Sequence, residues 1–166
     1  MNIDCSIQVG DLAEGGIVFY LDATGQHGLV AAVADLPGTY EWGCYFDNID
    51  GADGELIGDG NQNTEDIFEI QCTTADGGIT AAHATVSAEI DGYSDWYLPS
   101  IDELNEMYNS IGQGSLLNNI GNFHNDSFSY WSSTEIDEYH AWSMGFGTGD
   151  RGYGDKNGNN KVRPIR

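Results

Sequence analysis

The sequence has 166 residues, of which 40% are hydrophobic and 11% aromatic, enough to form one globular domain rather than a disordered acidic tail. It has 27 acidic and 5 basic residues, a formal net charge of −22 at pH 7. This charge repels phosphate polymers and anionic membranes, so no nucleic-acid partner is expected. No run of 18 apolar residues occurs, so no membrane insertion is expected.

The basic residues are confined to the last sixteen positions, whereas residues 1–150 contain no lysine or arginine. They are Arg151, Lys156, Lys161, Arg163 and Arg166. The simplest interpretation is a solvated acidic surface. Two alternatives stay open: some carboxylates bind divalent cations, or the basic C-terminal segment docks on an acidic subunit of a virion or surface assembly.

The chain is expected to form a domain over residues 10–166 after a short extension, 1–9. Short β-type runs at 17–21 and 29–33 flank turn residues and predict a hairpin. Residues 35–62 are predicted to be loop. Asn63 is predicted to cap a helix whose first turn is acidic, and an alanine-rich second helix is predicted at about 79–90.

The clearest local pattern begins at an extended segment ending in Pro99. Ser100 and Glu103 have the spacing of a capping box, and apolar residues then follow helical spacing to Ile111. Strands are predicted at 130–134 and 141–146, a Gly/Asp/Asn-rich loop at 147–160, and a closing strand at 161–166 beside 17–21. These elements predict an α+β fold.

The motifs together resemble one known family, the domain found at the C-terminus of the Legionella collagen-like adhesin, common in bacterial surface proteins and bacteriophages. The matching residues are Gly15–Leu21, His27–Leu29, Asn63–Thr64, Asp95–Ser100, Asp102–Leu104, Tyr130–Glu135, Ala141–Trp142 and Val162–Arg166. The resemblance implies a C-type-lectin-like fold, with two helices flanking a small antiparallel sheet and paired terminal strands. It also implies adhesion or glycan recognition. The adhesin favours sulfated polysaccharides, which need cationic partners that this acidic chain largely lacks.

The three cysteines, Cys5, Cys44 and Cys72, form no CxxC pair, so a zinc site is not favoured. A Cys44–Cys72 disulfide with a leftover thiol is preferred, because both residues lie in the long middle region; three reduced cysteines are the alternative. Family relatives often carry a further cysteine near Thr85, which leaves the pairing open. An extracellular or virion-surface location is expected.

The sequence lacks the GxSxG, HExxH and Walker motifs, and its four histidines are isolated, so no enzyme is expected. The leading hypothesis is a module that binds a surface glycan or protein receptor through the loops at 43–61 and 143–160. Its candidate ligand-binding residues are Tyr45, Asp47, Asp50, Asp53, Arg151, Tyr153 and Asn157. The alternative, based on the lack of a signal-peptide pattern and the family's occurrence in phages, is a structural or decoration protein of a phage capsid or tail that contacts the host surface.

Calcium is the expected cofactor if there is one. Asp155, Asn157 and Asn159 match the first half of a D-x-[DN]-x-[DN] loop, and the loop from Asp47 to Asp59 is a second candidate. Turn formation without a metal explains the same residues. Trp96 and Trp131 lie in strand-like motifs and are expected in the core.

Overall fold

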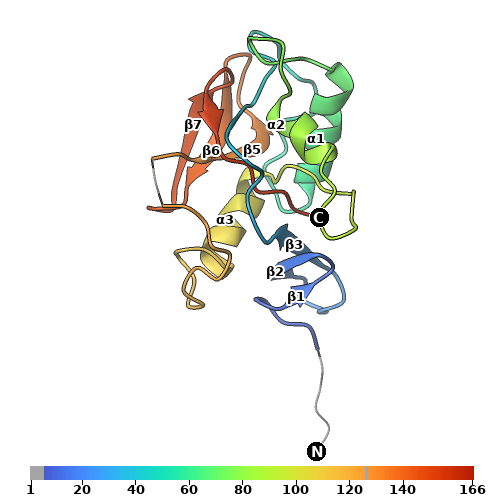
Figure 1. Cartoon of the computed structure of the whole chain (residues 1–166), viewed down its shortest axis with the longest axis vertical. Helices are drawn as coiled ribbons and strands as arrows, with labels where there is room; N and C mark the ends of the chain where they lie inside the picture. The colour runs from blue at the N-terminus through green and yellow to red at the C-terminus, as the bar shows by residue number, and fades with distance from the viewer. Residues whose placement is uncertain (1–5, 126) are drawn as a thin grey trace, which may run out of the picture.

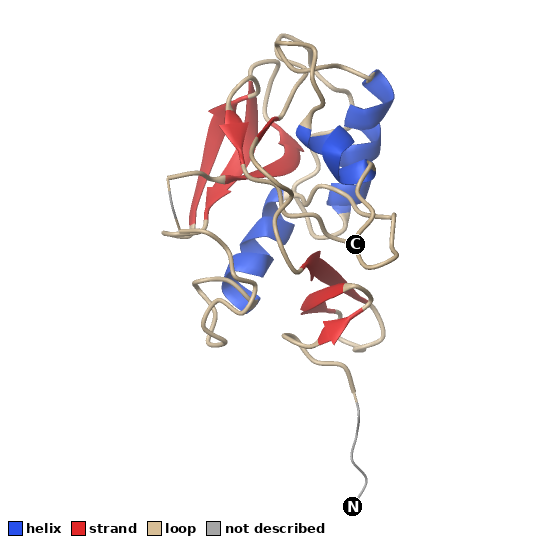
Figure 2. Cartoon of the chain, in the orientation of Figure 1, coloured by secondary structure: helices blue, strands red, loops and turns tan. Residues whose placement is uncertain are grey.

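The computed structural model describes residues 6–125 and 127–166, and in that part of the chain it contains three helices and eight strands. Figure 1 labels most of the elements and Figure 2 separates helices from strands by colour. The helices are α1 (Asp59–Ile70), α2 (Ala81–Val86) and α3 (Ile101–Ser110). The strands are β1 (Leu12–Ala13), β2 (Gly16–Leu21), β3 (Gly28–Ala32), β4 (Tyr40–Glu41), β5 (Tyr130–Glu135), β6 (His140–Gly145), β7 (Asp150–Asp155) and β8 (Asn159–Asn160). The α+β class is confirmed, with three helices where the resemblance implied two.

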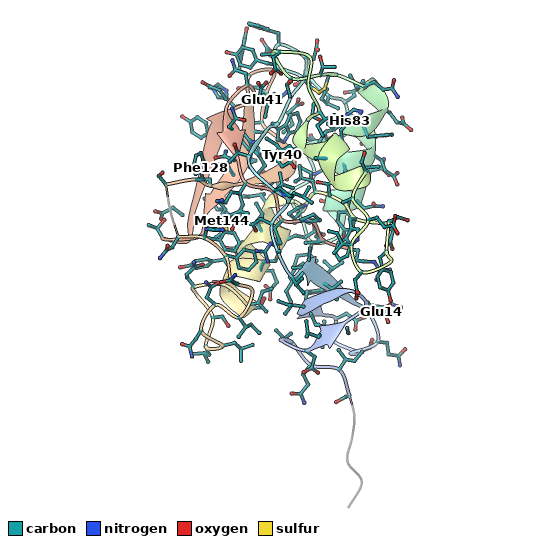
Figure 3. All side chains as sticks on the ribbon, viewed as in Figure 1. Glu14, Tyr40, Glu41, His83, Phe128 and Met144 are labelled. Carbon is teal, nitrogen blue, oxygen red and sulfur yellow. A yellow bond between two sulfur atoms is a disulfide. The ribbon has the colours of Figure 1, made fainter. Side chains whose placement is uncertain are left out.

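The strands form small antiparallel sheets with the orders β1-β2-β3, β4-β8 and β5-β6-β7. In Figure 1 the β5–β7 sheet lies on the left, α1 and α2 lie on the right, and the N-terminal sheet lies below. Strand β5 separates two apolar clusters, because consecutive strand residues point to opposite faces. Tyr130 joins the cluster that contains Met144 (Figure 3), whereas Trp131 joins the one that contains Trp42.

The predicted N-terminal hairpin is confirmed as β2 and β3. The prediction that 161–166 lies beside 17–21 was wrong, since Ile165 pairs with Ala31 of β3 and with Tyr97. The N–H of Val30 donates to the carbonyl of Arg166 at 3.0 Å. The outer edge of β2 is already occupied by β1, so the edge of β3 remains for the C-terminal segment.

The C-terminal segment buries side chains in two clusters. Ile165 contributes to the cluster that contains Tyr130, and Val162 to the one that contains Trp131. Both side chains are fully buried. Burial on both faces therefore resolves their odd spacing, and Pro164, which has no N–H to donate, leaves its carbonyl to accept from Ala32.

Helix α3 begins at the predicted capping box. The Ser100 hydroxyl accepts from the N–H of Glu103, and the Glu103 carboxylate accepts from the N–H of Ser100. Helix α2 is shorter than predicted: Thr80 caps its N-terminus and the helix ends at Val86.

The predicted start of the first helix at Asn63 was wrong, because α1 begins at Asp59 after Gly58. Asn63 lies inside the helix with its side chain buried. Its amide donates to the carbonyl of Gly54 at 2.7 Å and its oxygen accepts from the N–H of the same residue at 3.1 Å. The side chain therefore holds the preceding loop, and this use replaces the capping role.

The predicted loop at 147–160 was also wrong in part, since Asp150–Asp155 form β7 and pair with β6 in continuous register. A Cβ atom on Gly154 would lie 2.7 Å from the ring of Trp131. Close packing of the strand on a tryptophan therefore requires glycine at this position. The composition of the whole segment is nevertheless typical of a turn.

Three tryptophans belong to the core, as expected for Trp96 and Trp131; the third is Trp42. Each buried indole N–H donates to a backbone carbonyl, at 2.8–3.0 Å. These satisfied donors and buried rings exclude the three residues as a sugar-stacking surface in this structure.

Residues 1–5, which include Cys5 and part of the predicted extension, lie outside the described residues. Among the described helices, none has the length and apolar character that a membrane crossing requires.

Candidate functional site

An aromatic cluster lies on the surface where the loop after β4 meets the β5–β6 turn and the end of β7. We call it the aromatic knob, and it consists of Tyr45, Phe46, Tyr139, His140 and Tyr153. Phe46 is 70% exposed, Tyr153 67% and Tyr139 37%. Exposed aromatic rings gathered in this way are typical of a surface that contacts another molecule.

The planes of neighbouring rings in the knob meet at large angles. Tyr45, Phe46 and Tyr139 form a triangle with centroid distances of 4.4–5.7 Å and interplanar angles of 63–84°. His140 links this triangle to Tyr153, whose ring it meets edge-on at 5.3 Å. The knob is therefore one continuous group of rings drawn from three separate segments.

Backbone hydrogen bonds hold these segments together. The N–H of Phe46 donates to the carbonyl of Glu138 at 2.9 Å, and the N–H of Lys156 donates to that of Tyr139 at 2.8 Å. Phe46 has φ = +81°. A non-glycine residue in this region stores strain, which is found most often at functional sites.

A buried ion pair lies beneath the knob. The Lys156 ammonium contacts the Glu135 carboxylate and donates to the carbonyl of Asp47 at 2.8 Å, with no exposed side-chain surface. The same carboxylate accepts from the N–H of Ile49. Lys156 also lies 4.7 Å from the ring centroid of Trp42. One lysine therefore contacts the loop on both sides of Tyr45 and Phe46, at Trp42 and at Asp47.

A disulfide joins Cys44 to Cys72, with the two Cα atoms 5.2 Å apart. It ties the residue before Tyr45 to the segment that follows α1, whose C-cap is Gln71. Such a cross-link limits the freedom of the loop in the unfolded chain.

Polar groups border the knob. Asp137 accepts from the N–H of His140 at 2.8 Å and contacts its Nδ1 at 2.9 Å, while the Asp155 carboxylate lies 3.4 Å from its Nε2. Hydrogen bonding to His140 lowers the pKa of Asp137. The charge of the Glu138 carboxylate raises the pKa of the Tyr139 hydroxyl, so this phenol stays neutral.

The structure brings together some of the predicted ligand-binding residues. Tyr45 and Tyr153, from the two predicted loops, both belong to the knob, and Asp47 directly follows Phe46. Asp50 and Asp53 are exposed farther along the same loop. Between them, the carbonyl of Ala52 accepts a hydrogen bond from the N–H of Glu135, which holds the loop against β5.

Arg151 and Asn157 lie at the two ends of β7. Arg151 precedes Tyr153 by two residues, so it lies on the same face of the strand, and it is paired with Asp102 of α3. Asn157 is exposed in the turn after β7.

The predicted calcium ligands follow one another along the end of β7, the turn after it and β8. Asp155 faces His140, and Asn159 belongs to β8, where it lines a depression with Tyr40 and Glu41. In the described part of the chain, no three His, Cys, Asp or Glu side chains gather as a metal-binding group. Calcium binding also uses carbonyl and amide oxygens, so it stays a prediction.

Phe46, Tyr139 and His140 were missed in the sequence. Tyr139 and His140 follow Asp137 and Glu138 between two predicted strands, so a hairpin turn joining those strands could have placed them at one sheet end. They lie near Tyr45 through long-range contacts, which include those of the buried Lys156, and no local pattern indicates them.

No curated protein sequence matches the chain. A fimbrial protein from Bacteroides ovatus ATCC 8483 has a similar structure, with a TM-score of 0.57 and 14% sequence identity. The match covers 98% of this chain but 45% of the fimbrial protein, so it supports the fold alone. The sequence profile of the Lcl C-terminal domain matches residues 39–166, and this is the family that the motifs resemble. The chain therefore belongs to the Lcl C-terminal domain family, and this membership indicates a surface or adhesin-like module.

Proposed function

We propose that this chain is a non-enzymatic binding module, displayed outside the cell, that recognises a glycan or a protein receptor through the aromatic knob. The observation that carries the proposal is the exposure of Phe46 and Tyr153 on a backbone that other parts of the chain hold in place. Recognition residues are commonly found on loops supported by a rigid scaffold. Exposed aromatic side chains fixed before binding lose little conformational entropy when they contact a ligand.

Several features support parts of this proposal. The Cys44–Cys72 disulfide suits an oxidising compartment. The C-terminal segment that closes on β3, together with the long loops, suits a C-type-lectin-like variant. The buried carboxylates have structural partners, since Glu103 caps α3 and Glu135 pairs with Lys156. Structural partners for these acids favour a binding role over catalysis.

Arrays of glycans and of immobilised extracellular proteins test the proposal. The unmodified protein is compared with Tyr153→Ala and with Leu116→Ala, a control whose side chain is 99% exposed on a separate loop. Tyr153→Ala should weaken binding by about tenfold or more, the loss expected of an aromatic anchor, whereas the control should match the unmodified protein. Circular dichroism checks that both variants fold. Ligand binding that is equal in folded Tyr153→Ala and the unmodified protein contradicts the proposal.

A further inference from the structure

A more specific inference concerns the ligand of the aromatic knob, and it rests on the proposed function. Exposed acidic residues border the rings on several sides: Asp47, Asp137, Glu138 and Asp155. The side chains of Asp137 and Asp155 are 45% and 64% exposed. Aromatic faces also carry negative potential, so rings and carboxylates attract the same kind of group, a cation.

The lysine and arginine side chains of the chain do not lie on this surface to neutralise it. Lys156, beneath the knob, is fully buried against Glu135. Three arginines are paired within the chain: Arg151 with Asp102, Arg163 with Asp35 and Arg166 with Asp95. Lys161 lies 5.9 Å from the ring centroid of Phe128. With all five basic residues engaged inside a chain of net charge −22, the knob presents a negative face.

The geometry of the rings favours a protein partner over a polysaccharide. A sugar ring stacks on a flat aromatic face, but Tyr45, Phe46 and Tyr139 meet at 63–84° and pack against one another. Their edges and faces are therefore turned in different directions. Clustered tyrosine and phenylalanine side chains of this kind are typical anchors of protein interfaces.

We propose that the aromatic knob docks on a protein surface rich in lysine and arginine. The rings contact the apolar stems and cationic heads of these side chains, and the bordering carboxylates pair with the remaining charge. The net charge of the chain attracts such a partner over a longer range and raises its association rate. A sulfated polysaccharide is repelled by the same surface.

Isothermal titration calorimetry at physiological ionic strength tests this proposal with three probes. They are a short peptide of lysine, arginine and leucine, a chitosan oligosaccharide as a cationic glycan, and heparin as an anionic one. The double variant Asp47→Asn/Glu138→Gln removes two charges beside the knob. The double variant Glu65→Gln/Glu69→Gln removes two exposed charges from α1 and is the matched control.

The peptide should bind the unmodified protein, and binding should weaken about tenfold in Asp47→Asn/Glu138→Gln and in Tyr153→Ala. The α1 control should change affinity by about twofold or less, because exposed and distant charges are screened. Heparin should bind none of these proteins. Melting temperatures close to that of the unmodified protein establish that the variants remain folded.

Three results overturn the inference. Equal weakening in both double variants shows general attraction to an acidic protein, and knob-dependent binding of chitosan without the peptide shows a glycan partner. Knob-dependent binding of heparin or a neutral ligand refutes a cationic ligand while leaving the knob as the binding face. The proposed function is refuted by a different result: in the array experiment, ligands bind Tyr153→Ala as well as they bind the unmodified protein.

Discussion

The ammonium group of Lys156 lies in contact with the carboxylate of Glu135, and neither side chain is more than 3% exposed. This pair joins the end of β5 to the turn after β7 and, through the carbonyl of Asp47, to the loop that carries Phe46. Burial is the largest influence on Glu135 and raises the pKa of its carboxyl, against the lowering effect of Lys156. The shape of the knob therefore depends on a charged group hidden below it.

Lys156→Ala should destabilise the fold by about 3–5 kcal/mol, because it leaves the Glu135 carboxylate buried without its partner. Denaturant unfolding measures this loss. Arg151→Ala is the matched control: its exposed pair with Asp102 should contribute about 1 kcal/mol or less. Combining Glu135→Gln with Lys156→Met should recover part of the stability. An equal effect of the two single substitutions would contradict the buried pair.

Reduction of the Cys44–Cys72 disulfide should lower the unfolding free energy by about 2–4 kcal/mol. The two cysteines are separated by 28 positions in the sequence, and the reduced chain gains the conformational freedom of that loop when it unfolds. The measurement compares melting with and without reductant, alongside Cys72→Ser. In that variant, reductant should have no further effect. If the unmodified protein melts at the same temperature in both conditions, the disulfide does not constrain this loop.

The sequence predicted elements whose signals are local. Ser100 and Glu103 fix the start of α3 by contacts three residues apart, and the turn residues after Leu21 fix a hairpin. Motifs in the same segments are specific enough in combination to indicate the family, which the profile match over residues 39–166 confirms. The predictions were wrong where a contact with a residue outside the segment determines the local structure. The Asn63 amide donates to the carbonyl of Gly54 in the preceding loop, and Gly154 packs on the ring of Trp131.

The candidate site was only partly predictable for the same reason. Tyr45 and Tyr153 stand out as aromatic residues in loop-like sequence, but they are 108 positions apart and nothing local indicates that they belong to one cluster. Lys156 belongs to an Asp/Asn/Gly segment that is typical of an exposed turn. Its burial depends on Glu135 and Trp42, which come from other parts of the chain.

Arg163→Ala should be far more damaging than Arg166→Ala. The Arg163 guanidinium is buried, pairs with Asp35 and donates to the carbonyls of Ala32 and Gly121. Its loss removes these hydrogen bonds from buried acceptors and takes the arginine partner from Asp35, and it should cost about 3 kcal/mol or more. Arg166 pairs with the mostly exposed Asp95, so its loss should cost about 1 kcal/mol. Similar unfolding free energies for the two variants would refute the buried role of Arg163.

The stability of the protein should depend on the ionisation of Glu103. Burial raises the pKa of this carboxyl above its ordinary value of 4.5. The folded protein therefore holds the proton more tightly than the unfolded chain, so this group's contribution to stability is present below the ordinary value and is lost as pH rises through the raised one.

Glu103→Gln, which cannot ionise, should lack this dependence. Its stability relative to the unmodified protein should therefore improve between about pH 3 and about pH 7, although one hydrogen-bonding oxygen is lost. Chemical unfolding of both proteins across this range measures the difference. A constant difference at all pH values would show that Glu103 does not titrate with a raised pKa.

The central claim, that the aromatic knob is the binding face, is tested most directly by mapping a bound ligand on the protein. Backbone and aromatic NMR signals are followed while the lysine, arginine and leucine peptide is added to the unmodified chain. The largest shifts should fall on residues 44–47, 137–140 and 153–155, and they should be lost in Tyr153→Ala. Shifts concentrated on the acidic face of α1, or spread evenly over the acidic surface, would contradict the assignment of the knob.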